Sequence, residues 1–301
     1  MRVGLTVEIH GDHACSPAPR WTQIRRQARA AEDVGFDLVA LPDALFFGQD
    51  RRLSMWESTV VAGAIAAATE TIGIAHSVVN TPLRHPALIA KTAETLDEIS
   101  QGRYTLGIGA GDTTEDYRAL GIPAGLRYSR FAESTRIIHE LLRRGYADFE
   151  GEHHSAINTR FHPRGPRPSG PPIVMAAAGP RMLALCARYA DGWNWGASGP
   201  DRPDHLDDII ANLDHALEVE GRDPATLQRS LDVASVDVLG VAGDRRPGSL
   251  ITGTPDDIAA TLATLTDFGI NEVRIAVTAN PDQRPDAVAT LTEVVSLLHA
   301  I

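Results

Sequence analysis

One stretch of the sequence could bind an anion through its main chain. The apolar run 173–177 is followed by small residues, and a helical pattern starts at once with Pro180 and Arg181. The first N–H groups of a helix lack partners inside the helix, so they can hydrogen-bond an anion, and the helix dipole favours its charge. Arg181 adds a planar cation. A phosphate cradle and an ordinary tight strand–helix turn both fit this segment.

Carboxylates and a histidine at the ends of other apolar runs could carry acid–base chemistry. Asp43 and Asp112 each follow such a run, and Glu8 and His10 end the first one. A carboxyl group whose pKa is raised by burial can donate or accept a proton. Asp112, and His10 with Glu8, are candidates for this role. Asp112 also fits as the N-cap of the helix expected after it, and one residue can serve both purposes.

The glycines of "LGIGAGD", residues 106–112, keep the end of another apolar run free of side chains. Their spacing is Gly-x-Gly-x-Gly, whereas the Rossmann motif needs Gly-x-Gly-x-x-Gly and an acidic residue about 20 positions further on. The sequence therefore does not predict a nicotinamide site of that kind. We expect instead that a ring or a sugar packs against Gly109, Ala110 and Gly111.

The sequence gives little support for a metal site, a nucleophilic serine or cysteine, or a nucleic-acid-binding surface. The histidines of "HGDH" (10–13) and "EHH" (152–154) fit neither a helical His-x-x-x-His pair nor a zinc knuckle, so we expect no metal site. The chain contains no Gly-x-Ser-x-Gly motif, and Cys186 lies within an apolar helical pattern. The formal net charge of −11 argues against a nucleic-acid partner.

Short β-branched runs alternate with helical patterns and must position these residues. Nearly continuous apolar runs are typical of strands covered on both faces, and eight strand–helix units close a parallel barrel. We therefore expect an α/β fold, a (β/α)8 TIM barrel forming a single domain over residues 1–301, with its site at the carboxyl ends of the strands. The expected strands are 3–9, 37–41, 72–79, 104–109, 173–177, 192–195, 231–241 and 272–277.

Residues 146–172 interrupt this alternation between the fourth and fifth expected strands. They are rich in Gly, Pro and His and fit neither periodicity. Long loops without secondary structure in compact domains are usually functional or disordered. We expect an insertion loop that covers the barrel mouth as a lid.

We expect a cytoplasmic protein from the composition. No apolar stretch approaches the ~20 residues that a membrane helix needs. The chain starts without a charged and then apolar leader, and its two cysteines are far apart. We expect no membrane partner.

Four segments, taken in order, form a specific set: "ARAAEDVGFDLVALPD", "RHPALIAKTAETLDEISQGRYTLGIGAGD", "AAGPRML…ARYADGWNWG" and "GTPDDIAATLATLTDFGINEVRI". With them the chain resembles the luciferase-like (bacterial luciferase-type) superfamily of flavin- and deazaflavin-dependent oxidoreductases over nearly its whole length. The resemblance implies a TIM barrel, a flat tricyclic coenzyme and usually a homodimer.

Within that superfamily the chain is more similar to the branch that uses coenzyme F420, a 5-deazaflavin. The resemblance implies a non-proline cis peptide bond at Ser77–Val78 that backs the deazaflavin ring. It implies Asp112, His10 and Asp43 as catalytic residues. The implied coenzyme-binding residues are Asp43, Ser77, Val78, Asn80, Gly109, Ala110, Gly111, Ala177, Ala178, Gly179, Pro180, Arg181, Met182 and Asn194.

The chain departs from this branch at one position. Related F420-dependent dehydrogenases often carry a histidine after the aspartate of the second strand, where it acts as a base on an alcohol, but this chain has Ala44. We therefore expect hydride transfer between F420 and a small organic substrate, with the reductase direction favoured. The alternatives are a monooxygenase that uses reduced FMN and oxygen, and a catalytically silent protein that binds flavin or F420.

Overall fold

A closed parallel barrel forms the centre of the protein, as the sequence predicts. The computed structural model describes residues 1–12, 18–47, 53–111, 114–123, 125–196, 203–238, 251–277 and 285–301. The sheet closes because β1 pairs with both β3 and β15, while β8 pairs with both β6 and β11. The barrel strands are β1 (Arg2–Thr6), β3 (Leu38–Leu41), β6 (Gly73–His76), β8 (Tyr104–Gly109), β11 (Ile173–Ala176), β12 (Gly192–Gly196), β13 (Gln228–Asp237) and β15 (Glu272–Val277).

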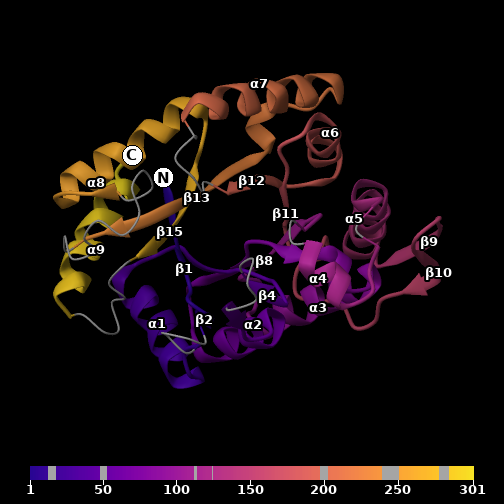
Figure 1. The fold of residues 1–301 in the computed structure, drawn as a ribbon, viewed down its shortest axis with the longest axis horizontal. Helices are drawn as coiled ribbons and strands as arrows, with labels where there is room; N and C mark the ends of the chain where they lie inside the picture. The colour runs from indigo at the N-terminus through magenta and orange to yellow at the C-terminus, as the bar shows by residue number, and fades with distance from the viewer. Residues whose placement is uncertain are drawn as a thin grey trace.

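Helices surround the barrel (Figure 1). They are α1 (Trp21–Val34), α2 (Ser58–Ala68), α3 (Pro86–Ile99), α4 (Thr114–Ala119), α5 (Arg127–Arg144), α6 (Pro180–Tyr189), α7 (Pro203–Val219), α8 (Pro255–Ala263) and α9 (Pro285–His299), with short 3-10 turns η1 (Thr81–Leu83), η2 (Pro224–Thr226) and η3 (Thr264–Phe268). Proline stands at the first position of α3, α6 and α8, where its missing N–H costs nothing. Thr254 and Asp257 form a capping box at α8.

Side chains on alternate strand positions separate an outer core from the barrel interior. Outward residues pack under the helices; α1, for instance, buries Ile24, Ala28, Ala31 and Val34 against the strands. The interior holds a small separate apolar cluster of Leu38, Ala40 and Ala75. Gly4 of β1 makes room there for Arg274 of β15, because a Cβ atom at Gly4 would lie 3.2 Å from Arg274 Cγ.

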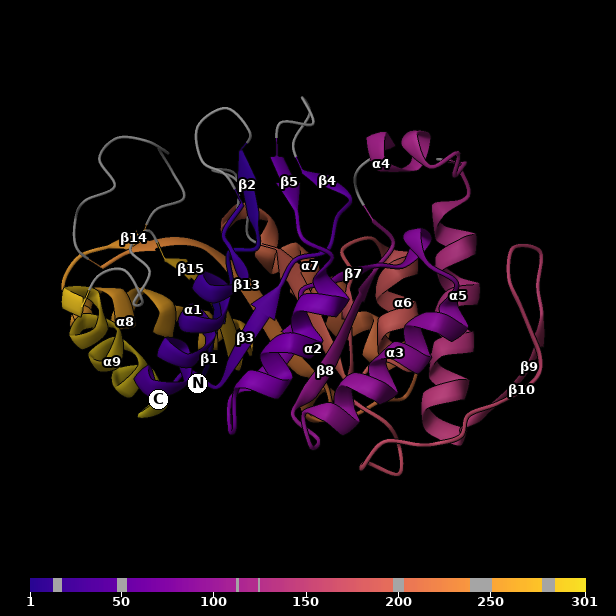
Figure 2. The same cartoon turned by 90° about the horizontal axis from the view of Figure 1, so that it is seen from below.

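Short strands stand at the carboxyl ends of the barrel strands, which lie at the top of Figure 2. β2 (His10–Asp12), β5 (Leu53–Met55) and β4 (Phe46–Phe47) form an antiparallel sheet there. β7 (Val79–Asn80) pairs with the end of β8, and β14 (Ile251–Thr252) pairs with β13.

The expectation for residues 146–172 is wrong in two respects. The segment begins as a β-hairpin, β9 (Tyr146–Glu150) with β10 (Ser155–Arg160), which runs beside α5 on the outside of the barrel (Figure 2). Arg164 and Arg167 then form ion pairs with Glu94 and Asp97 of α3. Arg167 also donates to the carbonyl of Tyr104, the first residue of β8. The segment therefore braces the side and the amino-terminal end of the barrel, and it does not cover the mouth.

Candidate active site

The end of β6 bends sharply at the mouth of the barrel. β6 stops at His76, the Ser77–Val78 peptide bond is cis, and the chain resumes as β7. The cis bond implied by the family resemblance is therefore present. The Val78 side chain is turned onto β8, where a Cβ atom added at Gly109 would lie 2.7 Å from Val78 Cγ2.

The glycines of "LGIGAGD" make room for the protein itself. A Cβ at Gly107 would lie 2.0 Å from the His76 carbonyl oxygen, and one at Gly111 would lie 1.5 Å from the Tyr117 hydroxyl. Gly111 also has φ +71°, which side-chain-bearing residues rarely adopt. Val78 and Tyr117 therefore occupy the space that side chains at positions 109 and 111 would need, and the contact of a ring with Gly109, Ala110 and Gly111 stays a prediction.

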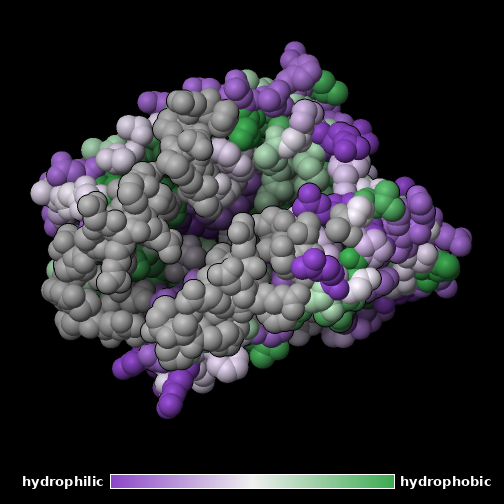
Figure 3. Space-filling model, in the orientation of Figure 1, coloured by the Kyte–Doolittle hydropathy of each residue, from purple (hydrophilic) through white to green (hydrophobic). Residues whose placement is uncertain are grey.

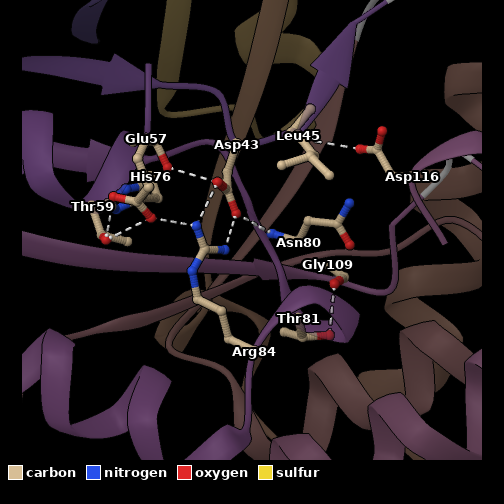
Figure 4. A network of polar contacts seen from close by, with 12 residues as sticks. Asp43, Leu45, Glu57, Thr59, His76, Asn80, Thr81, Arg84, Gly109 and Asp116 are labelled. Atoms are coloured by element: carbon tan, nitrogen blue, oxygen red, sulfur yellow. Dashed lines mark hydrogen bonds and ion pairs between the residues drawn. The ribbon is translucent and has the colours of Figure 1, made fainter. Parts of the chain in front are cut away.

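Asp43 is held from all sides by protein groups (Figure 4). Its Oδ1 atom accepts from Ser58 Oγ (2.8 Å) and Arg84 Nη2 (3.0 Å). Its Oδ2 atom accepts from the Asn80 amide (2.9 Å) and Arg84 Nη1 (2.6 Å). A carboxylate offers about four acceptor positions, so none is left for a ligand. These bonds give Asp43 a structural role, and its role as a catalytic or coenzyme-binding residue stays a prediction.

The electrostatics of Asp43 agree with a structural role. Burial raises the pKa of this carboxyl group, but the hydrogen bonds and charge of Arg84, with the Asn80 amide and the Ser58 hydroxyl, hold the pKa below its ordinary value. Asp43 is therefore ionised at neutral pH and cannot act as an acid there.

Asp43 helps to position the residues at the mouth of the barrel through its hydrogen bond with Asn80. Besides the bond from its amide to Asp43, Asn80 has its Oδ1 atom 3.2 Å from the Tyr117 hydroxyl, which lies 3.0 Å from the Ala110 carbonyl oxygen. Thr81 donates to the Gly109 carbonyl (2.9 Å). This network fixes the ends of β7 and β8 relative to each other.

The turn after β11 is open to solvent, as an anion cradle requires. Ala178, Gly179, Pro180 and Arg181 are exposed, and a Cβ at Gly179 would meet nothing within 4 Å. Within the described part of the chain, the amides of Ala178, Gly179 and Arg181 donate no hydrogen bond to another protein group. The Arg181 guanidinium lies over the Tyr128 ring, 4.3 Å from its centroid. Met182 is half-buried and donates its amide to the Gly179 carbonyl.

A polar floor inside the barrel joins the predicted residues Ser77 and Asn194 to residues that were not predicted. Asn194 is buried and donates to Ser230 Oγ (3.2 Å) and Asp232 Oδ1 (3.3 Å), and Ser77 Oγ donates to Asp232 Oδ2 (2.6 Å). Arg274, 1% exposed, donates to Ser77 Oγ (2.9 Å). The signal was present in the sequence, because the positions that share one face of each strand, 228, 230 and 232 in one and 272 and 274 in the other, all carry polar residues. The view onto the mouth shows a hollow with hydrophilic residues visible inside it (Figure 3).

The remaining candidates lie apart from this floor or outside the described residues. His10 stands on β2, paired with Met55 of β5, and Glu8 is exposed. Asp112 lies outside the described residues. Cys186 is buried, and burial raises the pKa of its thiol to about 12, so it is no nucleophile at neutral pH. Among the described residues, no cluster of three metal-ligating side chains occurs and no helix is long and apolar enough to cross a membrane.

Comparison with known proteins agrees with this geometry. A family model described as luciferase-like monooxygenase matches residues 1–236. An uncharacterised protein of Mycobacterium tuberculosis is 28% identical over 86% of this chain and 87% of its own length. The F420-dependent glucose-6-phosphate dehydrogenase of Nakamurella multipartita is 32% identical over 65% of this chain and 58% of its own length. The pyrimidine monooxygenase RutA of Caulobacter segnis is 30% identical over 74% of this chain and 66% of its own length.

Solved structures share the whole fold. An F420-dependent secondary alcohol dehydrogenase, solved with an F420–acetone adduct, has a TM-score of 0.81 at 16% identity and covers 99% of this chain and 98% of its own. The monooxygenase RslO1 of Streptomyces bottropensis has a TM-score of 0.83 at 18% identity, covering 100% of this chain and 99% of its own. The family match, the closed barrel and the cis Ser77–Val78 bond agree, and the chain belongs to the luciferase-like monooxygenase family as an F420- or flavin-dependent oxidoreductase.

Proposed function

We propose that this chain is an F420-dependent oxidoreductase that transfers a hydride between the deazaflavin ring and a small organic substrate, working as a reductase. The observation that carries the proposal is the exposed turn 178–181, whose amides and arginine suit the anionic tail of such a coenzyme. The similarity to an F420-dependent dehydrogenase supports F420. Ala44, in place of the histidine found in related dehydrogenases, favours reduction.

The residues at the mouth of the barrel would have different roles in this reaction. The bound coenzyme supplies the hydride, and reduction of the substrate consumes one proton besides it. Ala178, Gly179 and Arg181 would hold the phosphate, and Val78 would line the wall beside the ring. Asp112 stays our candidate for delivering the proton. We place the reaction in the cytoplasm.

Side-by-side fluorescence titrations with F420 and with FMN test this proposal. We expect F420 to bind at least about tenfold more tightly than FMN, a difference of about 1.4 kcal/mol. Tighter binding of FMN, together with oxygen consumption that depends on substrate, would instead establish the monooxygenase. The similarity to RutA is the observation that favours this second candidate. A protein that binds F420 but turns over no enone, imine or alcohol would be a silent carrier.

Arg181→Ala is expected to raise the dissociation constant of the coenzyme about tenfold or more, because a charge-assisted bond to phosphate is lost. The rate of hydride transfer at saturating coenzyme should change little, since the tail is remote from the reacting carbon. Arg188→Ala, on the same helix α6, is the matched control, since Arg188 is 58% exposed and forms a surface ion pair with Glu220. Equal affinities in both variants would refute the phosphate role of Arg181.

We further propose a homodimer that forms through the α1–α2 face. A groove of about 520 Å³ there is lined by Trp21, Trp56 and Val60, which are 39%, 52% and 71% exposed. Val60→Glu is expected to convert a dimer of twice 32.3 kDa into a monomer, measured by light scattering after gel filtration. Val219→Glu, at a residue 70% exposed on α7, should leave the mass unchanged. A dimeric Val60→Glu protein would place the interface elsewhere.

A further inference from the structure

Asp232 occupies a distinctive place on the inner wall of the barrel. Along β13, Gln228, Ser230 and Asp232 point inward, because alternate residues of a strand face the same side. Gln228 donates to Glu272 (2.6 Å) and Ser230 donates to the Trp193 carbonyl (3.0 Å), both inside the protein. Asp232 is the member nearest the mouth, and its side chain is 28% exposed, compared with 1% for Glu272.

The Asp232 carboxylate has acceptor capacity to spare. The described residues give it one short hydrogen bond from Ser77 Oγ (2.6 Å) and a longer one from Asn194 Nδ2 (3.3 Å). Arg274 Nη1 lies 3.9 Å away, beyond hydrogen-bond distance. Among the described residues, protein groups therefore use about two of the four acceptor positions of this carboxylate, whereas they use all four in Asp43.

The positive charge near Asp232 only partly balances the negative charge of its carboxylate. Arg274 is shared, because its Nε and Nη2 atoms both lie 2.9 Å from Glu272 Oε1. Arg2 also pairs with Glu272 (3.0 Å). Burial raises the pKa of Asp232 and Glu272 adds to this, and the opposing effects of Arg274, Ser77 and Asn194 are too weak to bring the pKa back to its ordinary value. Asp232 therefore holds its proton to a higher pH than an ordinary aspartate does.

Asn194 links Asp232 to the anion-binding turn. Its carbonyl lies 3.4 Å from the Ala177 amide, and the neighbouring Trp193 donates its Nε1–H to the Ala177 carbonyl (2.7 Å). The same residue thus touches the floor of the mouth and the start of the exposed turn. A ligand with an anionic tail on the turn and a ring over the mouth would meet both.

We propose that Asp232 is a coenzyme-binding residue whose carboxylate accepts a hydrogen bond from the ring N–H of the bound F420 or flavin at the barrel floor. This inference rests on the proposed function, for either coenzyme. Both rings carry an N–H between two carbonyl groups, and an ionised carboxylate is a strong acceptor for such a donor. A carboxylate kept partly exposed and partly unsatisfied beside Ser77–Val78 has little structural purpose otherwise.

Coenzyme titrations of wild type, Asp232→Asn and Asp214→Asn between about pH 5 and about pH 8 test the proposal. In wild type, affinity should fall as the pH falls through the pKa of Asp232, because the protonated carboxyl is a poorer acceptor. Asp232→Asn should bind about tenfold more weakly near neutral pH and lose this dependence. Asp214 pairs with Arg229, the outward neighbour of Ser230 on β13, so its variant should bind like wild type.

Melting temperatures separate binding from structure. Asp232→Asn should melt no lower than wild type at neutral pH, because it removes a charge that burial disfavours. Lower melting with unchanged affinity would make Asp232 a structural residue and overturn the proposal. Should Asp232→Asn fail to fold, Ser77→Ala replaces it: removing this donor should move the acid limb of coenzyme binding to higher pH, and an unmoved limb would overturn the proposal.

The wild-type titration distinguishes a failure of the proposed function from a failure of the assignment of Asp232. If wild type binds neither F420 nor FMN, the proposed function fails and this inference fails with it. If wild type binds one of them and Asp232→Asn binds it equally well, the assignment of Asp232 fails alone.

Discussion

Replacing Arg84 with alanine is expected to lower the free energy of unfolding by about 3–5 kcal/mol, because a buried carboxylate loses its ionic partner. The Asp43 side chain is only 3% exposed and that of Arg84 18% exposed, so water cannot replace the guanidinium. Glu57, which also pairs with Arg84 (2.6 Å), loses a partner too. Chemical denaturation of wild type and variant at neutral pH measures the difference.

The pH dependence of stability gives the same prediction a second check. The folded pKa of Asp43 lies below its unfolded value, so this pair contributes stability above the unfolded pKa and loses it as the pH falls through the folded pKa. Arg84→Ala should therefore flatten the loss of stability in acid. Arg188→Ala, which breaks an exposed pair, should change the free energy by no more than about 1 kcal/mol. A similarly small change in Arg84→Ala would show that Asp43 is not dependent on it.

The barrel could be predicted from the sequence because each strand and helix has a local sequence pattern of its own. Apolar β-branched runs, first-turn prolines and terminal glycines need no information from distant residues. The path of 146–172 could not be predicted in this way. Arg164 and Arg167 direct that segment to the amino-terminal end by pairing with Glu94 and Asp97, which lie about 70 residues earlier in the chain.

The sequence predicts where the site lies better than it predicts what each residue of the site does. Strand ends do gather Asp43, Ser77, Asn80 and Asn194 at one mouth, as parallel topology requires. Whether such a side chain is free or engaged depends on its partner, and the partner of Asp43 is 41 residues away. A carboxylate after a strand therefore looks alike in sequence whether it meets a ligand or an arginine.

Gly107→Ala is expected to have the other large effect, lowering the free energy of unfolding by about 3 kcal/mol or more. The new Cβ atom would lie 2.0 Å from the His76 carbonyl oxygen and 2.9 Å from Val78 Cγ1. The backbone carbonyl cannot rotate away as a flexible side chain can. The variant must push the bend at Ser77–Val78 off β8, so coenzyme affinity should fall together with stability.

Gly63→Ala provides the matched control for this clash. Its Cβ would meet only Leu96 Cδ2, at 3.5 Å, an ordinary contact on helix α2. Since alanine favours a helix over glycine, this variant should be more stable by about 0.5–1 kcal/mol. If both variants unfold like wild type and bind the coenzyme equally, the close approach of His76 and Val78 to β8 is not what requires glycine at position 107. If only Gly107→Ala is destabilised and it also loses coenzyme binding, the glycines at this strand end serve the coenzyme by making room for the bend at Ser77–Val78.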